Sequence, residues 1–163
     1  MDEAIAPIAE RMPWPGYEQP TEGRRLLSWR WATTRLQRSP RYWLATVGAS
    51  GTPHLTAVWA VWVGGRLVFS TGRPTRKARN LVGRPSCSVC TQGAKEAVVV
   101  EGVAEEVRDE PFAARANAAF VAKYGSSMLA EGSTVFAVRP HFVVGIIDSS
   151  TTVLPTRWRL QHA

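Results

Sequence analysis

The stretch YWLATVGASGTPHLTAVWAVWVGGRLVFS, residues 42–70, contains three β-prone apolar runs separated by turn-forming residues. The run 42–47 is followed by the turn cluster GASGTP, and the run 54–63 ends at a glycine pair that fits a two-residue hairpin connection. The third run, 66–70, returns from that hairpin. The pattern therefore predicts a meander of three antiparallel strands. Because the middle run is apolar on both faces, we expect it to be a central, enclosed strand.

The remaining segments predict further strands and three helices around this meander. Helices are expected over 22–38, with Thr21 as the cap, over 75–82 and over 110–124. Further strand patterns lie at 86–91, at 97–108 and on either side of Pro140, which we expect to separate two strands. Strands outnumber helices, so the sequence predicts a mainly β protein of the α+β class, a small barrel with flanking helices. Residues 1–20 form a proline-rich N-terminal extension, and residues 21–163 form a single domain.

The charge balance bears on the class of partner. Lys and Arg number 20 against 13 Asp and Glu, which gives a net charge of +7. Such a balance is typical of nucleic-acid-binding proteins, whose affinity falls steeply with salt. Here the basic residues are dispersed, and no zinc-finger spacing, RNP-like aromatic motif or basic tail accompanies them. We therefore expect a small anionic ligand and no nucleic acid.

The sequence also bears on location. No apolar run reaches the length of a membrane span, and the first residues carry acids where a signal peptide carries bases. We expect a cytoplasmic protein that does not associate with a membrane.

The two cysteines, Cys87 and Cys90, lie three residues apart in a predicted strand. Side chains at that spacing point to opposite faces of a strand, so the thiols diverge. We expect two reduced thiols and no metal site.

The segment STGRPTRKARNL, residues 70–81, crowds basic side chains around a helix entry. Thr75 is the expected cap, and Arg76, Lys77 and Arg79 follow it in the first turn, where the helix dipole is already positive. This arrangement costs stability unless an anion is bound; a solvated basic surface is the alternative. The segment predicts an anion site at the helix entry.

Several segments, in order, resemble the pyridoxamine 5′-phosphate oxidase-like flavoproteins, and among them the actinobacterial flavin/deazaflavin oxidoreductases. They are GTPH before one strand, VFST at the end of the next, RKARNL at a helix entry and TRWRL near the C-terminus, within residues 27–160. The resemblance implies a split β-barrel, FMN-binding-protein-like, that forms a homodimer. It also implies a cofactor in a groove between the barrels, with its phosphate beside the basic helix entry.

The resemblance further implies which residues contact the cofactor. Arg76 and Lys77 would hold the phosphate, hydroxyls at the end of the preceding strand would add hydrogen bonds, and the strand 55–59 would run along the tricyclic ring. Trp59 has an alternative role as a core or interface residue, and Gln92 as the start of a loop. The implied set is Leu55, Thr56, Ala57, Val58, Trp59, Ser70, Thr71, Arg76, Lys77, Asn80, Gln92 and Trp158.

Two cofactors fit this resemblance, the deazaflavin coenzyme F-420 and FMN, which share a tricyclic ring, a ribityl chain and a phosphate. F-420 also carries a tail of carboxylates, for which Arg24, Arg25 and Arg30 are the expected partners. We therefore expect an oxidoreductase that transfers hydride from reduced F-420 to an electron-poor small molecule, without a catalytic side chain. The alternatives are an FMN-dependent oxidoreductase of the same fold and a non-catalytic flavin- or deazaflavin-binding protein. Oxidation of pyridoxamine phosphate itself is not expected.

Overall fold

The structure, a computed structural model, describes residues 7–12, 25–93, 95–147 and 153–160. Within these residues it contains three helices and eleven strands. In chain order they are β1 (Ile8–Arg11), β2 (Arg25–Leu26), α1 (Trp29–Arg38), β3 (Tyr42–Val47), β4 (Pro53–Val58), β5 (Val61–Val63), β6 (Arg66–Gly72), α2 (Arg76–Gly83), β7 (Ser86–Thr91), β8 (Glu96–Glu106), α3 (Glu110–Tyr124), β9 (Ser133–Ile147), β10 (Val153–Leu154) and β11 (Thr156–Arg159).

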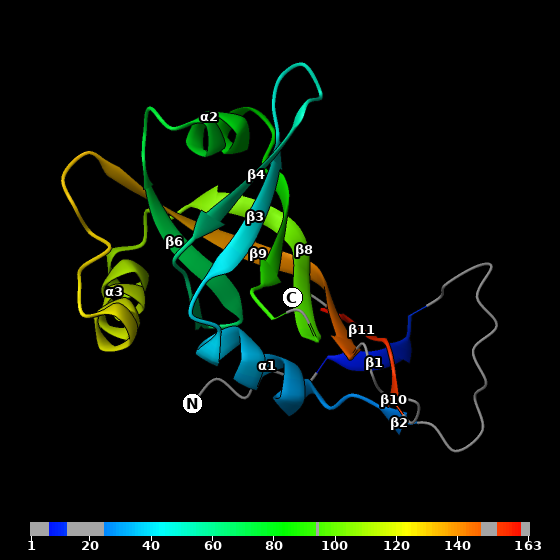
Figure 1. Ribbon diagram of the computed structural model, residues 1–163. Coiled ribbons are helices and arrows are strands. Elements are labelled where there is room, and N and C mark those ends of the chain that lie inside the picture. Colours follow the sequence, from blue (N-terminus) through cyan, green and yellow to red (C-terminus); the bar gives the residue numbers. More distant parts are fainter. Residues whose placement is uncertain (1–6, 13–24, 94, 148–152, 161–163) are drawn as a thin grey trace.

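Nine strands form one antiparallel sheet in the order β1-β11-β9-β8-β7-β3-β4, with β6 joined to β9 and β5 joined to β6. The long strand β9 organises this sheet, because its N-terminal part pairs with β6, its C-terminal part pairs with β11, and β8 runs along its other edge. The sheet curves around a core, and helices lie at its margins (Figure 1). This architecture confirms the predicted mainly β, α+β class.

The predicted meander is correct at its two hairpins and wrong in its middle strand. β3 pairs with β4, and β5 pairs with β6 across Gly64 and Gly65, whose φ values of 56° and 72° are those that a type I′ turn requires. The run 54–63, however, is interrupted at Trp59 and Ala60. It is not enclosed either, since β4 is an edge strand on which Leu55 is 62% exposed. Tertiary contacts at Ala60, given below, account for the interruption.

The strand expected to end at Pro140 continues through it. β9 runs without interruption from Ser133 to Ile147, and the pairing with β8 shifts register beside Gly102, which faces Pro140. A β-bulge therefore accommodates the proline. The extra residue in one strand interrupts the ladder of hydrogen bonds at this point, so the lack of an N–H group on proline costs no ladder bond.

The helices differ in how well their starts were predicted. α2 and α3 occupy the expected segments, capped by Thr75 and Asp109, and Gly125 ends α3 with a φ of 71°. α1 begins only at Trp29, where Ser28 caps it. Arg25 and Leu26 instead form the short strand β2, and the expected cap Thr21 lies outside the described residues.

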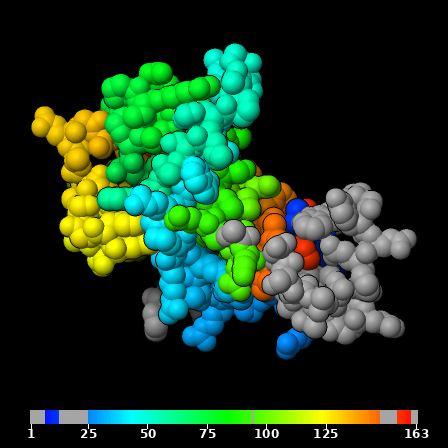
Figure 2. Space-filling view, viewed as in Figure 1, coloured from blue at the N-terminus to red at the C-terminus, as the bar shows by residue number. Residues whose placement is uncertain are grey.

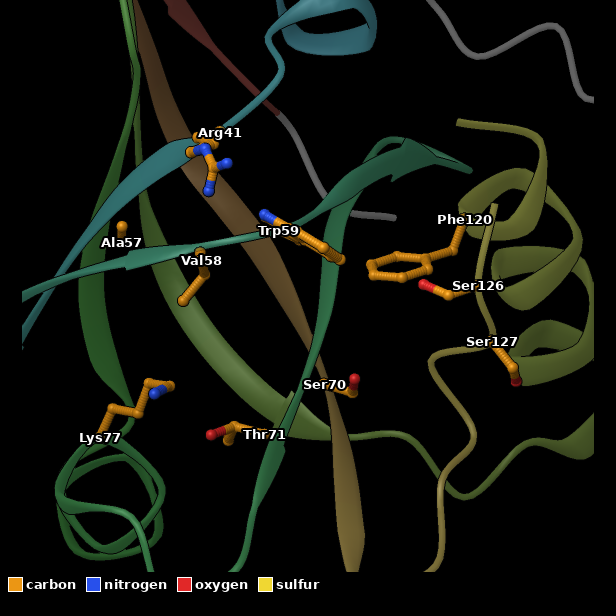
Figure 3. A pocket seen from close by; sticks show the side chains of 10 residues that line it. All are labelled: Arg41, Ala57, Val58, Trp59, Ser70, Thr71, Lys77, Phe120, Ser126 and Ser127. Carbon is orange, nitrogen blue, oxygen red and sulfur yellow. The ribbon is translucent and has the colours of Figure 1, made fainter. Parts of the chain in front are cut away.

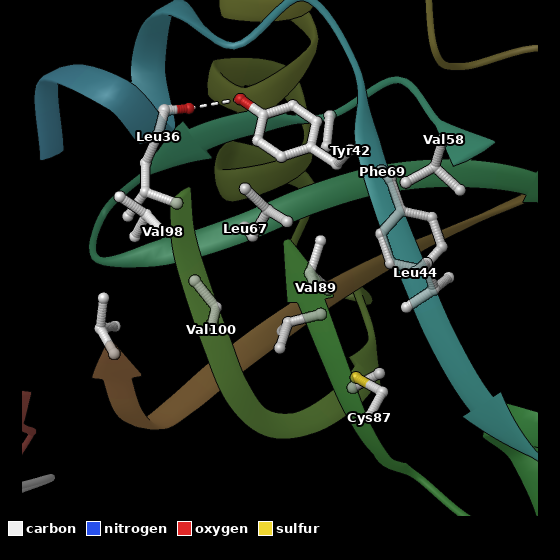
Figure 4. Packing of buried hydrophobic residues seen from close by; sticks show 14 of the residues in the cluster. Leu36, Tyr42, Leu44, Val58, Leu67, Phe69, Cys87, Val89, Val98 and Val100 are labelled. Carbon is white, nitrogen blue, oxygen red and sulfur yellow. Dashed lines mark hydrogen bonds between the residues drawn. The ribbon is translucent and has the colours of Figure 1, made fainter. Parts of the chain in front are cut away.

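The main apolar core fills the barrel and extends under α1, and a second cluster lies between α3 and strands β5, β6 and β9. Figure 4 shows Tyr42 among aliphatic side chains of the main core, with its hydroxyl donating a hydrogen bond to the Leu36 carbonyl oxygen. Cys87 is buried and Cys90 half-buried, and burial raises the pKa of the Cys87 thiol to about 12. None of the described helices is long and apolar enough to cross a membrane.

Candidate functional site

A surface cleft of about 360 Å³ lies where β4, β6, α2 and α3 meet (Figure 3). Its walls combine backbone-rich strand ends, two cationic side chains, two aromatic rings and several hydroxyls. No carboxylate lines it. The lining residues are Arg41, Ala57, Val58, Trp59, Ser70, Thr71, Lys77, Phe120, Ser126 and Ser127.

One end of the cleft is the entry of α2. Thr75 caps this helix by accepting a hydrogen bond from the Ala78 N–H, and its hydroxyl lies 3.0 Å from that of Thr71 at the end of β6. The first turn of α2 contains no acidic residue, while Arg76 is exposed and Lys77 is half-buried against the cleft. Free N–H groups, two hydroxyls and an ammonium group therefore converge at this end, an arrangement that suits a phosphate.

The other end of the cleft is aromatic. The indole of Trp59, 44% exposed, stacks on the ring of Tyr124, with centroids 5.1 Å apart and planes 8° from parallel. Phe120 lies 6.4 Å from Trp59, and the Arg41 guanidinium lies 5.8 Å from the centroid of the indole. A planar conjugated molecule can pack against these rings.

The C-terminal turn of α3 holds the chain at the point where β4 gives way to β5. Tyr124 Oη lies 3.0 Å from the Ala60 carbonyl oxygen and 3.2 Å from the Ala60 nitrogen, so the backbone of Ala60 is bonded to α3. Lys123 Nζ donates to the same carbonyl oxygen at 3.0 Å and to Tyr42 Oη at 2.8 Å. These bonds replace the strand ladder at this position and fix Trp59 at the mouth of the cleft.

Burial shifts the proton equilibria of this cluster. It lowers the pKa of Lys123 from 10.5 to about 8 and raises the pKa of Tyr42. Both shifts have the same cause, because the charged form of each group loses hydration in the interior.

The variant Lys123→Met is expected to change the pH dependence of stability. Between pH 8 and 10 the unfolded wild-type chain keeps a proton on Lys123 that the folded chain has released, so the free energy of unfolding rises with pH in that window. Above pH 10 the raised pKa of Tyr42 acts in the opposite direction, because the unfolded chain loses that proton first. Denaturant unfolding at about pH 7.5 and about pH 9.5 should show a smaller rise in Lys123→Met than in wild type. An undiminished rise would contradict this, and Lys95→Met, at an exposed position, serves as the control.

The structure gathers six of the residues implied by resemblance in the cleft. They come from the end of β4, the end of β6 and the first turn of α2, three elements that are separated in sequence. Arg76 is adjacent to them on α2, and Leu55 and Thr56 lie farther along β4, outside the cleft lining. The six are Ala57, Val58, Trp59, Ser70, Thr71 and Lys77.

Three other implied residues lie elsewhere. Asn80 is buried, and its Nδ2 donates to Thr46 Oγ1 at 2.9 Å, which ties α2 to β3. Gln92 is exposed after the end of β7. Trp158 is 0% exposed and packs 5.6 Å from Trp29 in the main core, so it is a core residue here and not a lining residue of the cleft, in contrast to the expected cofactor contact.

Sequence reasoning missed four lining residues: Arg41, Phe120, Ser126 and Ser127. Arg41 directly precedes β3, and the other three come from the C-terminal end of α3 and the loop after it. The apolar spacing of Phe120 on α3 marks it equally well as a core residue. Only the docking of α3 beside β5 brings Phe120, Ser126 and Ser127 to the cleft.

The sequence profile of the family described as pyridoxamine 5′-phosphate oxidase matches residues 32–147, most of the chain. The protein belongs to this family. The matched region contains β3, β4, β6 and α2, together with every residue that lines the cleft. A search of curated protein sequences found no match.

Solved structures share the fold of this chain. A conserved hypothetical protein from Mycobacterium tuberculosis is 21% identical, with a TM-score of 0.69, over 82% of this chain and 91% of the other. An F-420 reductase is 24% identical, with a TM-score of 0.56, over 68% and 93%. The haem storage protein HutZ from Vibrio cholerae is 20% identical, with a TM-score of 0.60, over 69% and 89%.

These likenesses confirm the split β-barrel fold that the sequence predicts. The family includes oxidoreductases, and the neighbours of similar fold include both an F-420 reductase and a haem storage protein. The fold alone therefore does not identify the ligand, and the residues of the cleft have to distinguish a deazaflavin from haem.

Proposed function

We propose that this protein is an oxidoreductase that uses the reduced deazaflavin coenzyme F-420 to transfer hydride to an electron-poor small molecule. The observation that carries the proposal is the cleft itself, in which Lys77 and two hydroxyls lie at one end and aromatic rings at the other. The coenzyme phosphate would lie at the first end and its tricyclic ring along the end of β4, so that the aromatic end borders the molecule that receives the hydride.

Each part of the coenzyme has residues of the cleft that would hold it. Lys77 and Arg76, with the N–H groups of the first turn of α2, would hold the phosphate, and Ser70 and Thr71 would donate hydrogen bonds to it. The end of β4, at Ala57 and beyond, would lie along the ring. Asn80 would act indirectly, by keeping α2 in place through its bond to Thr46.

Arginines near α2 favour F-420 over FMN, because only F-420 carries carboxylates beyond its phosphate. Arg79 and Arg84 are exposed on or beside this helix, have no ion pair with a described carboxylate, and would pair with the carboxylates of the tail, whereas Arg73 already forms an ion pair with Glu106 at 3.1 Å. The arginines expected from sequence lie elsewhere: Arg25 and Arg30 belong to β2 and α1, at the other end of β3, and Arg24 lies outside the described residues.

When bound, reduced F-420 supplies a hydride, and the task of the chain is to bind, orient and exclude water. Lys77 and the α2 entry would anchor one end of the coenzyme. Trp59, fixed by Tyr124 and by the bonds at Ala60, would limit where the reacting molecule can lie and would shield it from solvent. No side chain of the cleft is needed as a proton donor, since water can supply the proton.

A homodimer is part of the proposal. The outward side of β3 and β4 exposes apolar side chains in register, with Trp43 opposite Ala57 and Ala45 opposite Leu55. Trp43 is 46% exposed, and no helix covers the β3–β4 hairpin (cyan) on the face in Figure 2. An exposed apolar sheet face of this kind is typical of a subunit interface. A second copy there would lie next to the cleft, which Ala57 also lines.

Haem fits the cleft less well than a deazaflavin. Haem iron in proteins is bound by His, Cys, Met or Tyr, and none of these lines the cleft. A phosphorylated tricyclic coenzyme needs an anion site and a planar wall but no axial ligand, so the residues of the cleft favour this coenzyme over haem.

Calorimetric titration of the purified protein with F-420 and with FMN tests the proposal. F-420 is expected to bind at least about 10-fold more tightly than FMN, since the tail carboxylates add charge-assisted bonds. Light scattering of the loaded sample should give twice the chain mass of 17.9 kDa. Tighter binding of FMN would favour the flavin-dependent alternative, and no affinity for either would refute the proposed function. Loaded protein that reduces no enone or quinone would favour a binding protein without catalytic activity.

A further inference from the structure

Arg41 is a cation of the cleft that the proposed coenzyme does not use. Its side chain is exposed, and no carboxylate oxygen among the described residues lies within 4.0 Å of its guanidinium nitrogens. Other arginines of the barrel surface do have such partners: Arg35 pairs with Glu96, Arg139 with Glu105 and Arg157 with Glu10. Arg41 thus stands at the cleft without a described carboxylate partner, as do Arg76 and Arg79 of α2.

The position of Arg41 is fixed by its surroundings. Ser39 Oγ donates to the Arg41 carbonyl oxygen at 2.6 Å, and the guanidinium faces the ring of Trp59, which in turn stacks on Tyr124. A guanidinium at such a site is weakly hydrated and offers several N–H donors in a plane, which suits a carboxylate. Arg41 is therefore presented at the aromatic end of the cleft as a ready anion contact.

Arg41 and the phosphate end lie on opposite sides of the same cleft. Arg41 precedes β3, whereas α2 is tied to Thr46 near the far end of that strand. Figure 3 shows Arg41 beside Trp59 and Lys77 on the opposite side of Val58. The carboxylates of an F-420 tail extend from its phosphate, so they would leave the cleft at the α2 end and would not reach Arg41.

We propose that the hydride acceptor is a planar conjugated molecule with a carboxylate, which Arg41 binds while the exposed ring of Trp59, backed by the buried ring of Phe120, contacts the planar part. This inference rests on the proposed function. In the reaction the acceptor gains two electrons and one hydrogen as hydride from the reduced coenzyme, and one proton from water. The carboxylate is unchanged, so Arg41 acts as a specificity residue.

A matched pair of probes tests the inference: a 1,4-naphthoquinone with a carboxylate side chain and its methyl ester. Calorimetry on F-420-loaded protein should show that the carboxylate binds at least about 10-fold more tightly than the ester. Arg41→Gln should weaken the carboxylate by about 10- to 100-fold and leave the ester unchanged. The control Arg38→Gln removes an exposed arginine of α1 outside the cleft lining and should change neither affinity.

The inference is overturned if wild type binds acid and ester equally, or if Arg41→Gln weakens both alike. It is also overturned if Arg41→Gln lowers the affinity for F-420 itself, because Arg41 would then be a coenzyme contact. If the wild-type protein binds no coenzyme, that result refutes the proposed function and not this inference. The preference for acid over ester can then still be measured on the protein without coenzyme.

Discussion

The double variant Arg76→Ala/Lys77→Ala is expected to lose nearly all affinity for F-420, with a fall of at least about 100-fold, since each charge-assisted contact to a phosphate is worth about 1.5–3 kcal/mol. Arg76 is exposed and Lys77 half-buried, and neither forms an ion pair with a described carboxylate. Removing them should therefore leave the stability of the fold almost unchanged. It should even relieve repulsion at the positive end of the α2 dipole. Calorimetry measures the affinity, and denaturant unfolding measures the stability.

The matched control is Arg79→Ala on the same helix. It removes one positive charge, but its guanidinium bonds the Pro74 carbonyl oxygen and does not line the cleft. We expect only a small loss of F-420 affinity, through the tail, and none for FMN. If the double variant binds F-420 as tightly as wild type, the phosphate does not lie at the entry of α2. If Arg79→Ala lowers both affinities as much as the double variant does, the loss of positive charge in general explains the weaker binding, and a specific phosphate contact does not.

The variant Gly102→Ala is expected to destabilise the fold on the order of 4 kcal/mol, among the largest effects of a single substitution. A Cβ at this position would lie 2.1 Å from the Arg139 carbonyl oxygen and 2.9 Å from Pro140 Cα. These are backbone atoms in the adjacent strand β9, at the bulge that accommodates Pro140. Relief would require β8 and β9 to move apart, with loss of ladder hydrogen bonds on both sides.

Gly83→Ala provides the comparison for that substitution. Gly83 ends α2, has no positive φ, and a Cβ there would meet nothing within 4 Å. The change should be neutral or stabilise by about 0.4–1 kcal/mol, because alanine restricts the unfolded chain. Denaturant midpoints with unchanged slopes would give both values. A Gly102→Ala protein as stable as wild type would show that β8 and β9 are not paired in this register.

Local sequence signals predicted the elements whose residues alone suffice to specify them. Thr75 marks a helix start because its hydroxyl accepts a hydrogen bond from the Ala78 N–H, three residues on. Gly64 and Gly65 mark a hairpin because positive φ is accessible to them without strain. The basic first turn of α2 likewise predicts an anion site, and the anion site stays a prediction.

Predictions failed where the outcome depends on a distant partner. The apolar run 54–63 alone gives no reason to stop at Trp59, but Tyr124 and Lys123 bond the Ala60 backbone from α3. Pro140 alone suggests a strand end, but Gly102 on β8 allows a bulge that carries β9 past it. In both cases the deciding contact comes from another segment of the chain.

The sequence by itself determined the class of fold, the family and the cationic helix entry, because turn residues, caps and apolar patterns act through neighbours along the chain. Only the tertiary structure decided that Trp158 is core, that Arg41 and Phe120 line the cleft, and that α1 lies away from α2. The physical reason is that a cleft forms where elements far apart in sequence pack together, and its lining depends on how their side chains fill space, which no local pattern specifies.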